Sequence, residues 1–462
     1  MCSTVGRSND RRPGLNENKA LSAAILLASV FICASAALPQ HVHGTAEPKA
    51  RMDMGGSLLS GVLANREGSG TSWLPDSSPM PAFHLSAGSW NVMIHGGAFL
   101  RYTSQDVGNA GERGGSKLDA PSMVMFSASR PAGTGGRLML RTMISLDPLV
   151  EGGAGYPLLF QSGETWRGAE LVDRQHPHDL VGELAVSYSR SLGRSAEAFL
   201  YLGYPGEPAL GPATFLHRPS AANDPDAPLG HHWQDSTHIA FGVFTAGVRL
   251  GDVKLDGSIF TGREPNEERY GFDRPRFDSL SGRVSWNPTG NWALQISHGF
   301  LRGPEAVAPG VDVRRTTASA VHNLDLGNGR NLASAFVWGW NRDSDERSTH
   351  AILLESSFDR GRQAFYGRVE VVQKTGHDLG VDLLEGEAFW INALTLGSAR
   401  ALSSVGGIEL RLGGQVTFST VPRALRPYYG GFPVSLSLYL RISPARMSHR
   451  PDARMNGANR IR

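Results

Sequence analysis

The feature that most constrains this chain is a period-two alternation of apolar and polar residues. In residues 433–443 every second side chain is apolar, namely Val434, Leu436, Leu438, Leu440 and Ile442. Successive side chains of a β-strand point to opposite faces, so Ser435, Ser437, Tyr439 and Arg441 share the other face. The segment therefore predicts a strand with one apolar face, and its length suits a tilted bilayer-crossing strand of roughly 9–11 residues.

The same alternation returns in sixteen segments between Ser86 and Ser443, which predicts an all-β, antiparallel architecture. Short links such as Gly251 and Gly361 alternate with long ones, and the longest are residues 148–179 and 206–235. Alternating short turns and long loops along an even number of strands are typical of transmembrane barrels, with the short turns on the periplasmic side. The segments are 88–104, 121–130, 136–147, 180–192, 195–205, 236–250, 252–263, 276–287, 290–302, 314–325, 330–342, 348–359, 362–375, 386–400, 405–419 and 432–443.

Nearly every segment has an apolar face, and the chain offers no long helices to cover so large a surface. No apolar run of 18 residues follows residue 40, which excludes a bundle of membrane helices. Lipid is the cover that remains, and closing the sheet leaves no strand edge unpaired. Trp286, Trp292 and Trp390 stand near segment ends, as interfacial girdles require. The alternative is a secreted β-sandwich or propeller, but no repeat of about 40–50 residues supports a propeller.

With this pattern, residues 86–443 resemble the outer-membrane β-barrels of Gram-negative bacteria, at the size of a porin. The resemblance implies a transmembrane barrel of about 16 strands in the outer membrane, surrounded by its lipid and inserted by the barrel-assembly machinery. It also implies passage of small polar solutes or ions, and it fits a homo-oligomer. Two blocks, DRQHPHD at residues 173–179 and LGHHWQDSTHI at residues 229–239, are similar to those of an uncharacterised family of exported bacterial proteins. That narrower resemblance implies no activity.

The two ends of the chain have different characters. A basic stretch, an apolar stretch over residues 20–34 and the triplet Ala34-Ser35-Ala36 predict a secretory signal peptide over residues 1–36, with a short membrane anchor as the alternative. We expect residues 37–85 to be an irregular periplasmic lead-in, residues 86–443 the barrel, and residues 444–462 a polar, basic tail. Cys2 and Cys33 are the only cysteines, so the predicted mature chain has no disulfide or thiolate metal site.

Charged residues fall on the face opposite the apolar one and are predicted to line the lumen. The net charge is only +2, so we expect no nucleic-acid partner. A charged wall behind an apolar outer face favours a polar or hydrated interior. Two interpretations stay open: the charges select permeant ions, or they pair across neighbouring strands. The residues are Arg141, Glu183, Arg283, Glu355, Arg368, Glu370, Glu409 and Arg411.

Histidine concentrates in and just after the two longest links, with six of the 15 His between residues 176 and 238. Neutral imidazole and carboxylate together suit Zn²⁺, Cu²⁺ or Ni²⁺. Proline-rich runs beside them favour fixed loops folded over or into the barrel mouth. Ordered loop packing is the alternative, because the chain has neither HExxH nor CxxC. The predicted ligands are His176, His178, His231, His232, His238, Asp173, Asp179 and Asp235.

Methionine is concentrated as well, with eight of the 11 Met between residues 52 and 143. By alternation, the inward positions of three neighbouring strands are Met93, His95, Met123, Met125, Met139 and Met143. Thioether with imidazole suits Cu(I), whereas the alternative is that methionine fills irregular gaps against a loop.

These observations predict an outer-membrane channel for small polar solutes or ions that also binds or passes Cu or Zn, with no other cofactor. We predict that it is not an enzyme, because the chain lacks a G-x-S-x-G nucleophile elbow. The alternative is an outer-membrane enzyme or binding protein with a plugged lumen. A TonB-linked receptor is disfavoured, because it needs about 22 strands and a plug larger than residues 37–85.

Overall fold

The computed structural model describes residues 57–108 and 113–446. The predicted signal peptide and most of the predicted tail therefore lie outside the described residues. No helix within the described part of the chain is long and apolar enough to cross a membrane.

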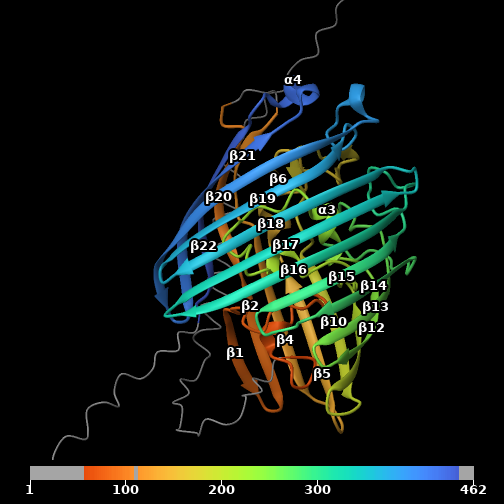
Figure 1. The fold of residues 1–462 in the computed structure, drawn as a ribbon, viewed down its shortest axis with the longest axis vertical. Coiled ribbons are helices and arrows are strands. Elements are labelled where there is room, and N and C mark those ends of the chain that lie inside the picture. The colour runs from red at the N-terminus through yellow and green to blue at the C-terminus, as the bar shows by residue number, and fades with distance from the viewer. Residues whose placement is uncertain (1–56, 109–112, 447–462) are drawn as a thin grey trace, which may run out of the picture.

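Eighteen strands form one continuous antiparallel sheet that closes on itself (Figure 1). The closing strand is β2 (Trp90–Gln105), which pairs with β22 (Val434–Pro444) on one side and with β4 (Ser122–Pro131) on the other. Along the same β2, β1 (Ala82–Ala87) continues the line of β22 and β3 (Gly115–Asp119) continues the line of β4. The eighteen strands thus occupy sixteen positions, which confirms the predicted closed barrel of 16 strands.

The remaining wall strands follow in chain order, each paired with its neighbour. They are β5 (Gly136–Ile144), β10 (Val181–Ser191), β11 (Ala196–Gly203), β12 (Val243–Leu250), β13 (Val253–Phe260), β14 (Ser279–Trp286), β15 (Trp292–Leu301), β16 (Val313–Gly327), β17 (Arg330–Asp343), β18 (Ser348–Arg360), β19 (Gln363–Thr375), β20 (Ala388–Val405) and β21 (Ile408–Thr420).

Short elements occur in the segments between and before the wall strands. Two small hairpins pair β6 (Tyr156–Pro157) with β9 (Arg174–Gln175) and β7 (Thr165–Trp166) with β8 (Ala169–Glu170). The helical turns are η1 (Ala64–Arg66), α2 (Asp147–Val150), η2 (Phe215–His217), α3 (His231–Gln234), η3 (Ser236–His238), η4 (Asp382–Leu384), η5 (Arg423–Leu425) and α4 (Arg426–Tyr429).

The short links lie at one end of the barrel and rely on glycine where the backbone turns back. Gly251, between β12 and β13, has φ +62°, and Gly361, between β18 and β19, has φ +60°. L-residues with a Cβ rarely adopt this left-handed region, whereas glycine does so at no steric cost. These turns hold neighbouring strands in the register that puts each apolar face outward.

The outer face of the wall is apolar and exposed. Trp286 and Trp292 are exposed at the short-turn end, and Tyr102 and Trp390 near the opposite end. An apolar belt with aromatic residues at both rims, around a closed sheet without free edges, is the surface of a barrel embedded in lipid. The protein is therefore a porin-like β-barrel of the Gram-negative outer membrane. Exposed apolar residues of the belt include Leu140, Leu184, Leu200, Leu255, Ile296, Leu354, Leu396, Leu412 and Leu438.

Three boundaries differ from the sequence-based expectation. The predicted strand 236–250 begins only at Val243, because the preceding residues turn inside the barrel as α3 and η3. The predicted lead-in 37–85 includes β1, and its residues 57–81 lie within the barrel, where for example Thr71 contacts Asp256 of β13. The long link 206–235 also lies inside the bore rather than across its outer mouth, as its contacts below show.

We predict that Leu438→Arg will impair insertion. Leu438 lies midway along β22 and is 65% exposed on the outer face, and a cationic residue near the bilayer midplane costs about 2–4 kcal/mol. Folding into lipid vesicles, followed by the mobility of unheated protein in gel electrophoresis, should show a smaller folded fraction. The matched control is Leu383→Arg in η4, which is 88% exposed outside the wall strands and should fold as wild type. Equal folded fractions for both variants would contradict the lipid-facing assignment of Leu438.

Candidate functional site in the barrel lumen

Three segments of the chain fill the lumen at successive depths. Residues 57–81 occupy the short-turn end, residues 204–242 cross the middle, and residues 147–179 lie towards the long-loop end. Their contacts with the wall are both polar and apolar and are distributed around the barrel. The site is therefore defined by how these segments are held and by the spaces left between them.

Residues 57–81 are fixed to the wall by hydrogen bonds and by a small apolar cluster. Thr71 Oγ1 donates to Asp256 Oδ2 at 2.6 Å, and Asn287 Nδ2 donates to the Leu74 carbonyl at 2.8 Å. Trp73 packs with Met139 and other buried side chains of this region. Because Asn287 follows β14 at the short-turn end, this segment narrows the periplasmic end of the bore.

Residues 204–242 cross the bore near its mid-depth. Ala209 N donates to Ser258 Oγ of β13 at 2.7 Å, and Tyr439 of β22 donates to the Asn223 carbonyl. At the far wall Trp233 Nε1 donates to Thr349 Oγ1 of β18 at 2.8 Å. A segment bonded to strands on several sides of the barrel divides the lumen.

Arg218 anchors this crossing segment. Its Nε donates to Glu355 Oε1 of β18 at 2.7 Å, and its Nη1 donates to Asp235 Oδ2 at 2.6 Å. All three side chains are almost completely buried. Burial opposes ionisation, but Arg218 beside Asp235 holds the pKa of that carboxyl below its usual value. The arginine thus ties the segment to the wall through its buried pair with Glu355, and its buried pair with Asp235 joins two parts of the segment.

The predicted lumen charges all lie on the inward face of the wall, and most are buried in pairs. Arg141 of β5 contacts Glu183 of β10 at 2.7 Å, and Arg368 of β19 contacts Glu355 of β18 at 3.1 Å. Glu370 instead accepts from the Leu229 backbone N at 2.6 Å. The other pairs are Arg283 with Asp256, and Arg411 with Glu409 and Asp359. Arg141 and Glu183, Arg368 and Glu355, and Arg283 and Asp256 thus pair across neighbouring strands, whereas Arg411 pairs within β21 and with Asp359 of β18.

The predicted methionine patch divides into two parts. Met123, Met125 and Met143 pack together against Leu216 of the crossing segment, whereas Met139 packs with Trp73 near the short-turn end. The remaining methionine, Met93, is buried on β2 opposite His84 and Ser127.

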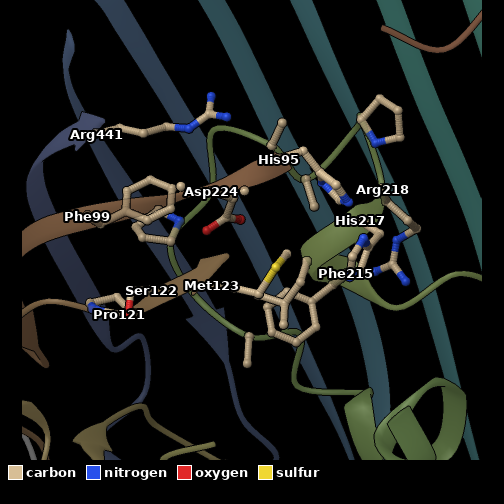
Figure 2. A pocket seen from close by; sticks show the side chains of 18 of the residues that line it. His95, Phe99, Pro121, Ser122, Met123, Phe215, His217, Arg218, Asp224 and Arg441 are labelled. Carbon is tan, nitrogen blue, oxygen red and sulfur yellow. The ribbon is translucent and has the colours of Figure 1, made fainter. Parts of the chain in front are cut away.

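His95 joins the methionine cluster to a cavity of about 160 Å³ at mid-depth. Its Nε2 lies 3.2 Å from Met125 Sδ, and its ring lies edge-on to His217 at 5.4 Å between centroids. Figure 2 shows His95 and His217 next to one another, with Met123 below them and Asp224, Arg218 and Arg441 around the same space. The cavity is therefore lined by imidazole, thioether and charged groups of both signs.

The predicted histidine ligands form one continuous cluster between the two long segments. The His178 ring lies 5.3 Å from the His238 ring, which lies 5.1 Å from the His231 ring. His231 adjoins His232 at 5.7 Å, and His232 adjoins His176 at 6.1 Å. Burial lowers the pKa of His231 to about 4 and those of His176 and His238 well below the usual value. These three rings are therefore neutral near pH 7.

Carboxylates from later loops adjoin this cluster. Glu264 and Glu305 each lie 3.6 Å from His232 Nδ1. Burial alone would lower the pKa of His232, but these two carboxylates outweigh it and raise that pKa. Burial, with Glu164 and Glu305 nearby, raises the pKa of Glu264 to about 8. Glu264 and Glu305 were not singled out in the sequence, because they stand in links that carry no histidine.

The three predicted aspartate ligands have different partners. Asp173 lies apart from the rings, where it accepts from Arg113, Tyr429 and the Phe160 backbone. Asp179 lies 3.7 Å from Arg269. Asp235 accepts from His231 Nδ1 at 2.6 Å and so positions a ring. Among the described residues, no group of three or more His, Cys, Asp or Glu side chains is already arranged to hold a metal ion.

Comparison with known proteins finds distant structural likeness only. No protein-family model matches this chain, and no curated protein sequence matches it. An anion-selective porin from Comamonas acidovorans is similar over 77% of this chain and 99% of its own, with 13% identity and a TM-score of 0.47. OmpF of Salmonella typhi, in complex with daunomycin, is similar over 78% and 99%, with 8% identity and a TM-score of 0.48. OmpT of Vibrio cholerae, folded in vitro, is similar over 78% of this chain and 99% of its own, with 10% identity and a TM-score of 0.43. The fold assignment rests on the closed sheet itself and not on these likenesses.

We predict that Arg218→Met will lower the free energy of unfolding by about 3–5 kcal/mol, because it removes the arginine partner of buried Asp235 and one of the two arginine partners of buried Glu355. Urea titration in detergent, followed by tryptophan fluorescence, measures the change. The matched control is Arg347→Met, whose pair with Asp345 is partly exposed and should cost no more than about 1 kcal/mol. Similar losses in the two variants would show that Arg218 is not an anchor.

We predict that Glu207→Gln will flatten the pH dependence of stability. Burial raises the pKa of Glu207 from 4.5 to about 8, although Ser69 and Arg283 act to lower it. The contribution of the protonated carboxyl is fully present below about pH 4.5 and is lost as the pH rises through about 8. Glutamine cannot ionise, so the free energy of unfolding should fall less in the variant than in wild type between about pH 5 and pH 9. The difference should be at least about 1.4 kcal/mol, the equivalent of one pKa unit. Thermal unfolding across this range tests it, and equal losses would contradict it.

Proposed function

We propose that this protein is a restrictive outer-membrane pore, which passes small polar solutes or ions through a lumen narrowed by its own chain. The observation that supports this most is that charged and hydrogen-bonding groups stand among the apolar ones that line the spaces left inside the barrel. The outer wall, in contrast, is apolar. The charged and hydrogen-bonding groups of the lining would form hydrogen bonds with water and with small polar solutes, and so would replace the bulk water that solvates them outside the barrel.

Two spaces define the proposed route. The cavity of about 160 Å³ at mid-depth is lined by both long segments and by residues of β2. A second space of about 380 Å³ opens at the short-turn end, between residues 61–66 and the turns near Gly251 and Gly290. A liquid water molecule takes about 30 Å³, so the mid-depth cavity suits a few waters or one small solute. Residues 57–81 separate the two spaces, which accounts for a restrictive pore rather than a wide one.

The charges of the route favour neither anions nor cations strongly. Arg218 and Arg441 lie near Asp224 around the mid-depth cavity, and the wall charges are mostly paired. Neutralised pairs leave little net field to select a sign of charge. We therefore propose selection by size and polarity.

A second candidate is a binding protein with a closed lumen. The observation that favours it is the burial of wall side chains that an open pore would wet: Arg101 is 0% exposed, and Lys254 and Arg315 are 1% exposed. In that case the mid-depth cavity would hold a ligand rather than form part of a route. The two candidates differ in whether current crosses the barrel.

Single-channel conductance with a reversible lock tests the proposal. In a Cys2→Ser, Cys33→Ser background, Asn223→Cys with Ser357→Cys would join the crossing segment to β18, where Asn223 Nδ2 lies 3.2 Å from Ser357 Oγ. The chain without the added pair should show discrete conductance steps. Oxidation of the pair should lower the step size or the open fraction, and a reductant should restore it on the same channel, because the route depends on the position of this segment.

The matched control joins two wall strands on the lipid side and touches no lumen segment. Ser334 of β17 and Ser356 of β18 are directly paired, with their hydroxyl oxygens 2.8 Å apart. Ser334→Cys with Ser356→Cys should conduct equally when oxidised and reduced. The absence of steps from every form, including the reduced lock, would overturn the pore and favour the closed binding protein.

A further inference from the structure

The two longest lumen segments meet at three histidine rings whose second nitrogens are already engaged. His178 Nδ1 lies 2.7 Å from Asp147 Oδ2, and His231 Nδ1 lies 2.6 Å from Asp235 Oδ1. His238 Nδ1 lies 3.0 Å from the Asp235 carbonyl oxygen, to which only an N–H can donate. Each ring is thus held through Nδ1 by an oxygen acceptor. A histidine held in this way presents the lone pair of Nε2, as metal-bound histidines do.

Two of these three Nε2 lone pairs have no partner. His178 Nε2 and His238 Nε2 are buried, and neither has a hydrogen-bond partner in the described structure. With Nδ1 donating, each Nε2 is an acceptor shielded from water, and a buried polar atom left unpaired costs free energy. An acceptor without a donor is satisfied equally well by a cation. Two such atoms on adjacent rings therefore point to a shared positive ligand.

The spacing of the rings agrees with a common ion. The His178 and His238 rings are 5.3 Å apart and the His238 and His231 rings are 5.1 Å apart, between centroids. With Zn–N bonds of about 2.0 Å and tetrahedral angles, two imidazoles on one ion have centroids roughly 5 Å apart.

We propose that a divalent transition-metal ion of the zinc class binds to Nε2 of His178, His231 and His238, with water or a solute from the adjoining space as the fourth ligand. Asp147 and Asp235 are positioning residues that hold the rings. Among the described residues no group of three or more His, Cys, Asp or Glu side chains is placed to hold a metal ion, so the proposed binding requires at least one of these rings to move. His178 belongs to the segment 147–179, and the other two belong to 204–242. The ion therefore links two segments that are far apart in sequence.

This site does not depend on conduction. It needs only the contact between the two segments, and it would stand in a closed binding protein as well as in a pore. The neighbouring groups His232, Glu264 and Glu305 are not part of the proposed ligand set. Here two carboxylates, each 3.6 Å from His232 Nδ1, adjoin a single imidazole.

Equilibrium dialysis of the refolded full-length protein against Zn²⁺ tests the proposal, and Co²⁺ substitution adds a spectroscopic readout. We expect wild-type protein to bind one more Zn²⁺ per chain than a variant that lacks either unpartnered ring. We also expect the Co²⁺-substituted wild type to show the visible bands of a tetrahedral nitrogen site. His178→Ala and His238→Ala should each lower the affinity at this site at least about 10-fold. Asp147→Asn should weaken it about 10- to 100-fold, the range seen when a partner of a metal-bound histidine is changed.

The control variant is His298→Ala, on the exposed face of β15, which should bind as wild type. Barrel mobility on unheated gels checks that each variant has folded, and His178→Gln replaces His178→Ala if the latter does not. Zn²⁺ binding that is equal in wild type, His178→Ala and His238→Ala would overturn the proposal. So would wild-type protein that binds no Zn²⁺, or tetrahedral Co²⁺ bands that persist in both histidine variants.

Discussion

The structure depends on one constraint: in lipid, every backbone N–H and C=O of the wall must find its partner within the wall. That constraint is met at β2, a strand of 16 residues that pairs with β1 and β22 on one side and with β3 and β4 on the other. The change from β1 to β22 falls at Gly96 and Gly97, and the change from β4 to β3 falls at Phe99 and Leu100. Gly96 has φ +130°, and a Cβ there would collide with the Met123 carbonyl oxygen. A residue without a Cβ lets the wall close there.

A second requirement follows inside the barrel, where the crossing segment has little regular structure to satisfy its own backbone. Wall arginines supply the missing donors. Arg101 donates to the Pro225 carbonyl at 2.9 Å, Arg283 to the Gly211 carbonyl at 3.0 Å and Arg368 to the Asp226 carbonyl at 2.9 Å. Each of these arginines also pairs with a carboxylate. The inward charges therefore hold an irregular, proline-rich segment in place, in addition to neutralising one another.

The wall was predictable because its signal is local. Alternation along each strand decides which residues face lipid, so positions such as Leu412 and Arg411 could be assigned without knowing their neighbours. The contents of the lumen depend on contacts between distant residues. Arg218 meets Glu355, 137 positions away, and no local period encodes that. The histidines were singled out as a group because they are concentrated in one part of the sequence. Glu264 and Glu305, which later loops bring to the same place, carry no such local signal.

The two segments bonded across the bore also have a mechanical consequence. A hollow sheet closed on itself resists stretching along its hydrogen bonds but can flatten into an ellipse under lateral pressure. Here residues 204–242 connect β13 to β18 and β22 through hydrogen bonds, and residues 57–81 connect Asp256 to Asn323. These spans act as struts, so flattening the wall requires breaking buried polar contacts. The cross-section of this barrel is thus braced from within, and its stiffness resides in the chain that fills it.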